Sequence, residues 1–186
     1  MDKNLLGKVV IVTGAESGIG QSIAKRCTEG GANVMASGIN EEGLGKTTEL
    51  CAELGEDNRL ISMVADIREP TAVEDMISCT VKEFGRLDAT IANAGISLGQ
   101  TSFLDISLDD WDRMIATNLR GVFITLQAAA KVLKKQGEGG SLLATGSSTA
   151  IKVAPGLASY IAAKGGVHMM MQAIALELAE YNIRVN

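Results

Sequence analysis

The chain has 186 residues, of which 46% are hydrophobic, so it is long enough and apolar enough to fold as one domain around a substantial core. Its net charge at pH 7 is −5 and its basic residues are scattered, which argues against a nucleic-acid-binding surface. No apolar run reaches the ~18 residues of a membrane span, and residues 1–8 lack the apolar stretch of a signal peptide, so we expect a cytoplasmic protein without a membrane segment.

Apolar runs alternate with helical patterns along the chain. The first run, residues 8–13, is rich in β-branched residues, which is typical of a parallel strand buried on both faces. A helix follows, in which Ile19, Ile23 and Cys27 recur at helical spacing. Further strands are predicted at residues 33–37, 59–65, 87–92, 139–145 and 183–186, and further helices at residues 41–54 (with Gly55 just past the end), 70–84, 109–136 and 159–181.

This alternation of strands and helices predicts an α/β fold. We expect a Rossmann-type, doubly wound parallel sheet between two layers of helices, in a single domain over residues 1–186. The helix that begins near Pro70 illustrates the pattern, because one face of it is apolar. The residues of that face are Val73, Met76, Ile77 and Phe84.

The glycine-rich turn TGAESGIG, residues 13–20, links the first strand to the first helix. Its glycines permit a tight turn and let backbone amides approach a pyrophosphate, and the helix N-terminus adds N–H groups and partial positive charge. We interpret it as a dinucleotide-binding turn, although a plain strand–helix turn also uses glycine. Residues 45–47 end like a P-loop, but Asn40 stands where that motif needs glycine, so we interpret this second segment as a solvated helix.

Tyr160 and Lys164 lie four residues apart on the last predicted helix and therefore share one face. A nearby ammonium or oxidised nicotinamide lowers the pKa of a phenol from about 10 toward the range useful for acid–base catalysis. Composition alone gives such a pair about one time in ten, so it is weak by itself. Ser147 follows the fifth strand, at the carboxyl edge where open α/β folds bind ligands, and its hydroxyl can donate to a substrate oxygen. Ser147 and Ser148 also suit a simple cap or turn.

The cysteines and the single histidine do not suggest a metal site or a disulfide framework. Cys27, Cys51 and Cys79 are odd in number and far apart, so we expect three reduced thiols. His168 is the only base available for a Ser-His-Asp hydrolase, and it lies in a Met-rich part of the last helix, where we expect it to pack. No bound metal is expected.

Together these features resemble the classical short-chain dehydrogenase/reductase family over essentially the whole chain. The motifs occur in the family's order: the glycine turn, Asp66, Asn93-Ala94-Gly95, Asn118 in the segment TNLRG, then the serine, tyrosine and lysine above. The resemblance implies hydride transfer between NAD or NADP and a small secondary alcohol or ketone.

The resemblance also implies a role for each matching residue. Tyr160 is the general acid–base; Lys164 lowers its pKa and bonds the nicotinamide ribose. Ser147 orients the substrate oxygen, and Asn118 holds a water that extends the proton relay. The candidate catalytic residues are thus Asn118, Ser147, Tyr160 and Lys164, and the candidate cofactor contacts are Thr13, Gly14, Ser17, Gly18, Ile19, Gly20, Gly38, Asp66, Ile67, Asn93, Ala94, Gly95, Tyr160 and Lys164.

The sequence departs from the family at the end of the second strand. NAD-dependent members usually carry an acidic residue there, and this chain has Gly38; NADP-dependent members place basic residues where this chain has Ile39 and Ser17. We expect a preference for NAD, because nearby glutamates would repel a 2′-phosphate. An aspartate in place of Gly38 should strengthen that preference. The glutamates concerned are Glu16, Glu41 and Glu42.

A second departure is that the chain stops inside the predicted strand 183–186, before the family's substrate lid and final strand, so we expect the polypeptide to continue beyond Asn186. The loop of residues 150–157 is mostly apolar, which favours an uncharged, moderately apolar substrate. By the resemblance, helices 109–136 and 159–181 form a homodimer or homotetramer interface. Two alternatives stay open: a dinucleotide-binding protein without catalysis, and an assembly role in which Met169 to Met171 serve an interface instead of the core.

Overall fold

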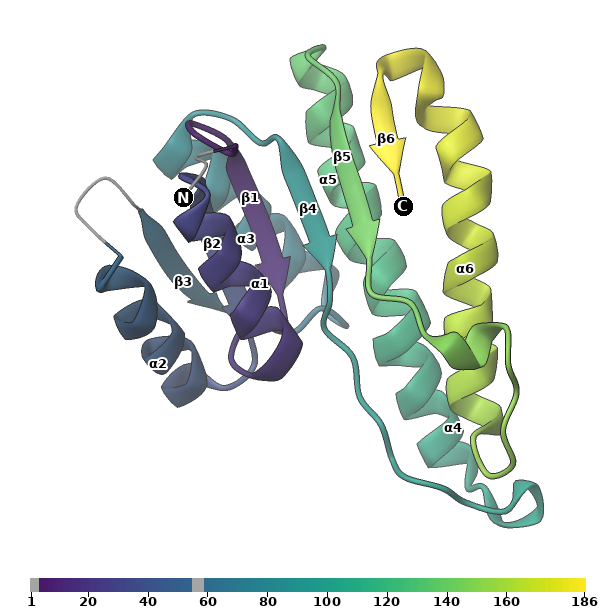
Figure 1. Ribbon diagram of the computed structural model, residues 1–186. Helices are drawn as coiled ribbons and strands as arrows, with labels where there is room; N and C mark the ends of the chain where they lie inside the picture. Colours follow the sequence, from purple (N-terminus) through teal and green to yellow (C-terminus); the bar gives the residue numbers. More distant parts are fainter. Residues whose placement is uncertain (1–3, 55–58) are drawn as a thin grey trace.

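The computed structural model describes residues 4–54 and 59–186 and contains a six-stranded sheet flanked by helices (Figure 1). The strands are β1 (Val9–Thr13), β2 (Asn33–Gly38), β3 (Leu60–Val64), β4 (Ala89–Ala92), β5 (Gly140–Ala144) and β6 (Ile183–Val185). All neighbouring strands are parallel, in the order β3-β2-β1-β4-β5-β6. This is the order of a Rossmann sheet, so the fold expected from the sequence is confirmed.

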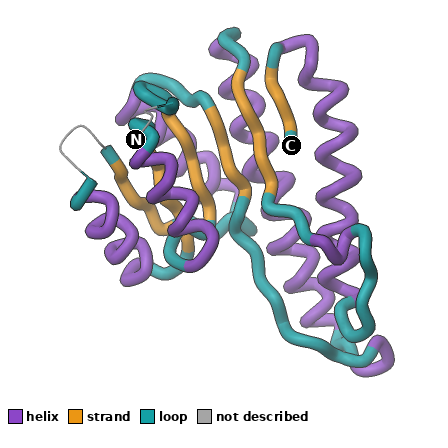
Figure 2. Tube along the Cα trace, viewed as in Figure 1, coloured by secondary structure: helices purple, strands orange, loops and turns teal. Residues whose placement is uncertain are grey.

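The helices alternate with these strands along the chain (Figure 2). The α-helices are α1 (Gly18–Glu29), α2 (Glu41–Ala52), α3 (Pro70–Phe84), α4 (Leu108–Ile115), α5 (Val122–Gln136) and α6 (Ala158–Leu178). Short helical turns are η1 (Phe103–Asp105), η2 (Ala116–Gly121), η3 (Ser148–Ala150) and η4 (Ala179–Tyr181). None of the helices in the described part of the chain has the length and apolarity needed to cross a membrane.

Two hydrophobic clusters lie on opposite faces of the sheet. On one face, Ala24 of α1 and Leu44 of α2 pack against alternate residues of β1 and β2. On the other face, α3, α5 and α6 contribute most of the larger cluster, in which Ile11 and Leu142 are completely buried. Burial of β1 on both faces agrees with its continuous β-branched sequence, and all five of its residues are buried. The two clusters therefore hold the sheet from both faces and thereby position the carboxyl ends of its strands.

The helix predicted at residues 109–136 is in fact two α-helices joined by one wider turn. α4 and α5 are separated by η2, whose hydrogen bonds follow the π pattern. Such a turn inserts one extra residue into the helix, and π turns occur frequently at functional sites. The hydrophobic period alone could not reveal this interruption, because it continues on both sides of η2.

Three local expectations were wrong. Ile19 does not join the core face of α1, since 66% of it is exposed. Thr47 is not solvated: it is fully buried, and its hydroxyl donates to the carbonyl oxygen of Ala15 at 2.8 Å. His168 is exposed on α6 and not packed inside. The expectation for Gly55 falls outside the described residues.

Candidate active site

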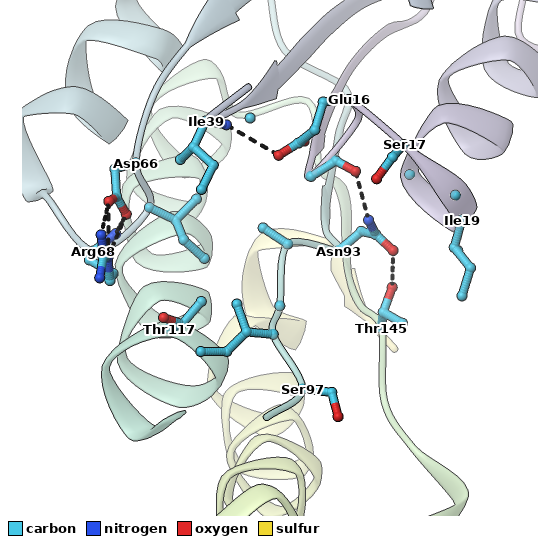
Figure 3. A pocket seen from close by; sticks show the side chains of 18 of the residues that line it. Glu16, Ser17, Ile19, Ile39, Asp66, Arg68, Asn93, Ser97, Thr117 and Thr145 are labelled. Carbon is cyan, nitrogen blue, oxygen red and sulfur yellow. Dashed lines mark hydrogen bonds and ion pairs between the residues drawn. The ribbon is translucent and has the colours of Figure 1, made fainter. Parts of the chain in front are cut away.

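A cavity of about 590 Å³ opens at the carboxyl edge of the sheet (Figure 3). Its wall includes the residue that ends, or directly follows, each of the first five strands: Gly14, Gly38, Ala65, Asn93 and Thr145. The chain runs from β1 to β2 and β3 on one side and then returns to β4 on the other side of β1, and this reversal of strand order leaves a crevice at the carboxyl edge. The sheet topology thus creates the cavity, and its size is within the range of cofactor sites.

The glycine turn forms one wall of the cavity. A Cβ atom on Gly20 would lie 1.9 Å from the carbonyl oxygen of Gly14, so only glycine lets α1 begin this close to β1. Gly18 has a φ of +52°, and nothing lies within 4 Å of where its Cβ would be. Ser17 precedes α1 but its side chain does not cap the helix. The start of α1 therefore offers N–H groups without a side-chain cap, next to a glycine with open space around it, which fits a pyrophosphate.

A hydrogen-bond network ties this turn to β4 and β5. The side-chain amide of Asn93 donates to the carbonyl oxygens of Thr13 (3.1 Å) and Gly14 (3.3 Å), and its Oδ1 accepts from the hydroxyl of Thr145 at 2.9 Å. The hydroxyl of Thr13 in turn accepts from the backbone N–H of Asn93 and of Ala94. Figure 3 shows Asn93 between the glycine turn and Thr145. Thr13, Asn93 and Ala94 therefore fix the floor of the cavity.

Glu16 occupies the space beside Gly38. Its Oε1 accepts from the backbone N–H of Ile39 at 3.2 Å, and a Cβ on Gly38 would lie 1.9 Å from its Oε2. An aspartate at position 38 could therefore be accommodated only if the Glu16 carboxylate moved aside, and its expected effect on NAD binding stays a prediction. Of the three glutamates considered, only Glu16 lines the cavity; Glu41 and Glu42 are exposed on α2.

Asp66 lies at the far end of the cavity, after β3, and is paired with Arg68. Its carboxylate accepts from Nε of Arg68 at 2.9 and 3.0 Å and from Nη2 at 2.5 Å. The hydrogen bonds from Arg68 lower the pKa of Asp66. Ile67 lines the cavity between them and is 5% exposed. This end thus offers a neutral ion pair and an apolar side chain, a suitable environment for a purine ring.

Tyr160 and Lys164 line the opposite part of the cavity, one turn apart near the start of α6. Lys164 is 5% exposed, and its ammonium donates to the carbonyl oxygen of Thr145 at 2.7 Å. Burial lowers the pKa of Lys164. No carboxylate pairs with this ammonium among residues 4–54 and 59–186. Lys164 therefore places a positive charge, without a negatively charged partner among the described residues, in the same cavity wall as the hydroxyl group of Tyr160.

Asn118 lies in η2 and is completely buried. Its side chain pairs with the backbone of Ile96: Oδ1 accepts from the N–H and Nδ2 donates to the carbonyl oxygen, both at 2.8 Å. Asn118 also lies behind Gly95, where an added Cβ would be 3.1 Å from its Oδ1. Its side chain thus holds the segment after β4 in place, next to Lys164.

Ser147 lies to one side of this arrangement. Its Oγ is 2.8 Å from the hydroxyl oxygen of Thr149 and accepts from that residue's backbone N–H at 3.2 Å. It lines a neighbouring hollow of about 290 Å³, together with His168, and not the main cavity. The structure therefore brings Tyr160 and Lys164 to the glycine turn, with Asn118 behind them, and leaves Ser147 beside the group.

The sequence analysis did not identify eight of the wall residues: Ala65, Arg68, Ile96, Ser97, Leu98, Arg113, Thr117 and Thr145. Thr145 could have been noticed, since it follows β5 at the sheet edge. Arg113 and Thr117 depend on the course of the helix through η2. Within the described part of the chain, no three His, Cys, Asp or Glu side chains come together as a metal site would require.

Comparison with known proteins gives one consistent result. The short chain dehydrogenase family matches residues 8–186. L-rhamnose 1-dehydrogenase (NAD(P)(+)) of a Sphingomonas species is 35% identical over 99% of this chain and 72% of that protein. Levodione reductase of Leifsonia aquatica is 32% identical over 96% of this chain and 67% of that protein. The crystal structure of carveol dehydrogenase from Mycobacterium avium in complex with NAD superposes with a TM-score of 0.94, at 34% identity, over 98% of this chain and 70% of that one.

Proposed function

The chain belongs to the short-chain dehydrogenase family and is an oxidoreductase that uses NAD or NADP; on that basis we propose that Tyr160 exchanges the proton while hydride moves between cofactor and a secondary alcohol or ketone. One observation carries the assignment: Lys164, buried and without a carboxylate partner among the described residues, shares the cavity wall with Tyr160. A buried ammonium favours an ionised phenol nearby, which makes that phenol a better base.

The bound nicotinamide supplies or accepts the hydride. The chain's own residues would bind and orient the cofactor. The turn from Gly14 to Gly20 holds the pyrophosphate with backbone N–H groups. Asp66 and Ile67 border the adenine. Oriented by the Thr145 carbonyl oxygen, Lys164 would hold the nicotinamide ribose, and its charge lies in the cavity wall that also contains Tyr160.

Two further residues complete the proposed proton path. Ser147 would polarise the substrate oxygen; its hydroxyl must then exchange its contact with Thr149 for one with substrate. The Asn118 side chain is bound to the backbone of Ile96, so its contribution to a water relay would come through the backbone of η2. Turns of the π type are frequent at functional sites, which supports that role.

The surroundings of the site guide the remaining proposals. Ile151 and Val153, in the loop after β5, are 76% and 79% exposed, which supports an uncharged substrate of moderate apolarity. Met169 and Leu176 expose 63% and 83% on α6, and Phe123 exposes 44% on α5, so we propose a homodimer or homotetramer through these helices. Residues 1–186 would form one domain. A cytoplasmic location is supported by three free thiols, two of them buried.

The test is a steady-state assay with a panel of alcohols and ketones. L-rhamnose, xylitol, carveol and levodione are natural members of the panel, because proteins similar to this one are named for them. We expect reduced nicotinamide to form or disappear with at least one member, at a rate proportional to enzyme concentration. Binding of NADH without turnover of any secondary alcohol or ketone would contradict the proposal and leave a binding protein.

A further inference from the structure

The end of β2 lacks the acidic side chain that reads the ribose of NAD in many dinucleotide-binding sheets. The structure supplies a carboxylate there from another element. Glu16, in the turn after β1, extends over the last residue of β2, and its Oε1 accepts from the backbone N–H of Ile39 at 3.2 Å. Figure 3 shows Glu16 and Ile39 joined in this way at the cavity wall. The position is filled, but by a residue 22 places earlier in the chain than Gly38.

Two glycines make room for this side chain. A Cβ on Gly38 would lie 2.4 Å from the Cδ of Glu16, and a Cβ on Gly43 would lie 2.9 Å from its Cβ and 2.6 Å from its carbonyl oxygen. The neighbouring Ala15 is held from both sides, because its N–H donates to Ser37 at 2.9 Å and its carbonyl oxygen accepts from Thr47 at 2.8 Å. The carboxylate is therefore fixed at the end of β2 and does not sample the solvent freely.

The charge at this position is not neutralised. Glu16 forms no ion pair in the described part of the chain, and its Oε2 is buried without a hydrogen-bond partner. The guanidinium in this part of the wall, Arg68, is bound by the carboxylate of Asp66. Ile39 and Ser17, which flank Glu16, carry no charge. A phosphate placed here would meet the negative charge of Glu16, and among the described residues the cation of this part of the wall, Arg68, is already paired with Asp66.

Resting on the proposed function, we propose that Glu16 selects NAD(H) over NADP(H). Its Oε1 accepts a hydroxyl hydrogen of the adenosine ribose beside the N–H of Ile39, and its charge repels a 2′-phosphate. Gly38 serves this selection because it has no side chain, and Gly43 serves it in the same way. In this chain, the carboxylate that contacts the ribose would thus come from the glycine turn and not from the end of β2.

The decisive variant is Glu16→Gln, which keeps the shape and the acceptor for the Ile39 N–H but removes the charge. Dissociation constants for NADH and NADPH would be measured by fluorescence titration, and those for ADP and adenosine 2′,5′-bisphosphate by calorimetry. We expect the ratio of the NADPH constant to the NADH constant to fall about tenfold in Glu16→Gln, because the repulsion is lost. The two adenosine compounds should show the same change, which assigns it to the adenosine end.

Two companion variants sharpen the result. Glu41→Gln removes the same unit of charge from an exposed position outside the cavity wall and should leave the ratio unchanged. Gly38→Ala should displace the Glu16 carboxylate and lower the ratio as Glu16→Gln does. An unchanged ratio in Glu16→Gln, an equal change in Glu41→Gln, or tighter binding of NADPH than NADH by the unsubstituted protein would each overturn the assignment. Failure of the unsubstituted protein to bind either nucleotide would overturn the proposed function as well.

Discussion

The two edges of the sheet differ in the partners of their charged side chains. At the amino edge, Asp88 accepts from the backbone N–H of Val9 at 2.9 Å, from Nε and Nη2 of Arg86 at 2.9 and 2.8 Å, and from Lys8 at 3.2 Å. Arg86 also pairs with Glu138 at 2.7 Å. At the carboxyl edge, Lys164 has a carbonyl oxygen as its partner and Glu16 has a backbone N–H.

The pKa directions express the same contrast. Burial alone would raise the pKa of Asp88, but hydrogen bonds from Arg86, Val9 and Lys8 outweigh it and lower the pKa, so the charged form is favoured. Burial lowers the pKa of Lys164, so its charged form is disfavoured. Charges at the amino edge are compensated within the chain and stabilise the fold. At the carboxyl edge Asp66 is likewise paired with Arg68, but Lys164 and Glu16 have only uncharged backbone partners in the described part of the chain, an arrangement typical of functional sites.

The largest expected effect is at the carboxyl edge, where Tyr160→Phe removes only the phenolic hydroxyl. Turnover should fall by about 10²- to 10⁴-fold, the usual contribution of a general acid–base. The NADH dissociation constant and the melting temperature should stay the same. Tyr181→Phe is the matched control, because the Tyr181 hydroxyl accepts from Lys134 away from the cavity and should not affect turnover. Turnover near the normal rate in Tyr160→Phe would remove Tyr160 from the mechanism.

At the amino edge, Asp88→Asn should act on stability and leave the rate alone. It removes a charged acceptor that binds donors of three residues, so we expect the free energy of unfolding at pH 7 to fall by about 1–3 kcal/mol. The folded pKa of Asp88 lies below the ordinary value of 3.8, so its stabilisation is complete above that value and is lost as the pH falls through the folded pKa.

Urea unfolding at a series of pH values measures this directly. The difference between Asp88→Asn and the unsubstituted protein should be constant near neutral pH and disappear in acid. Asp75→Asn, on the exposed face of α3, is the control and should change little. A large loss of turnover per folded molecule in Asp88→Asn would show that the two edges are coupled and that the separation of stability from catalysis is wrong.

Lys164→Met tests two consequences of burying the Lys164 ammonium, one for stability and one for turnover. Because the folded pKa of Lys164 lies below 10.5, the unfolded chain binds more protons between these two values, and stability should rise with pH across that window. Lys164→Met should lack this rise, and its turnover should fall because the phenol loses its neighbouring charge. Chemical unfolding from pH 8 to 10.5 provides the comparison. Identical pH profiles for the two proteins would mean that the ammonium is not held at a cost in the folded state.

The smallest effect is expected for Thr145→Val. It removes the 2.9 Å hydrogen bond to Asn93 but keeps the carbonyl oxygen that Lys164 uses. Unfolding free energy should fall by about 1 kcal/mol, the net value of one hydrogen bond. Turnover should change less than in the other carboxyl-edge variants. Complete loss of turnover would show that the hydroxyl itself takes part in the chemistry.

Much of the fold could be predicted from the sequence because it depends on short-range patterns. The β-branched run of β1, the glycines of the turn and the four-residue spacing of Tyr160 and Lys164 each identify one local structure. The parallel arrangement of the strands then follows from the strict alternation of strands and helices, whereas their order in the sheet is seen only in the structure. All six strands occur where the apolar runs predicted them, with ends shifted by one or two residues.

The rest depends on contacts between distant residues, which no local pattern contains. The π turn at Ala116–Gly121 keeps the apolar period of a continuous helix. Glu16 reaches the end of β2 only because Gly38 and Gly43 lie beside it in space, and the sequence could name Glu16 only as one of three glutamates. The orientation of Ser147 depends on its own contact with Thr149. The proposed cofactor choice and the proposed contact with substrate depend on these same features.

The carboxyl edge of the sheet should bind a nicotinamide dinucleotide with its pyrophosphate at the glycine turn and its nicotinamide beside Tyr160, and every prediction for that edge depends on this placement. A crystal structure of the protein with NAD+ would reveal it. We expect the pyrophosphate against the backbone of Gly14 to Gly20, the adenosine ribose on the Glu16 carboxylate, and the nicotinamide ribose on the ammonium of Lys164. A dinucleotide bound elsewhere, or one whose nicotinamide lies away from Tyr160 and Lys164, would show that the proposed site is wrong.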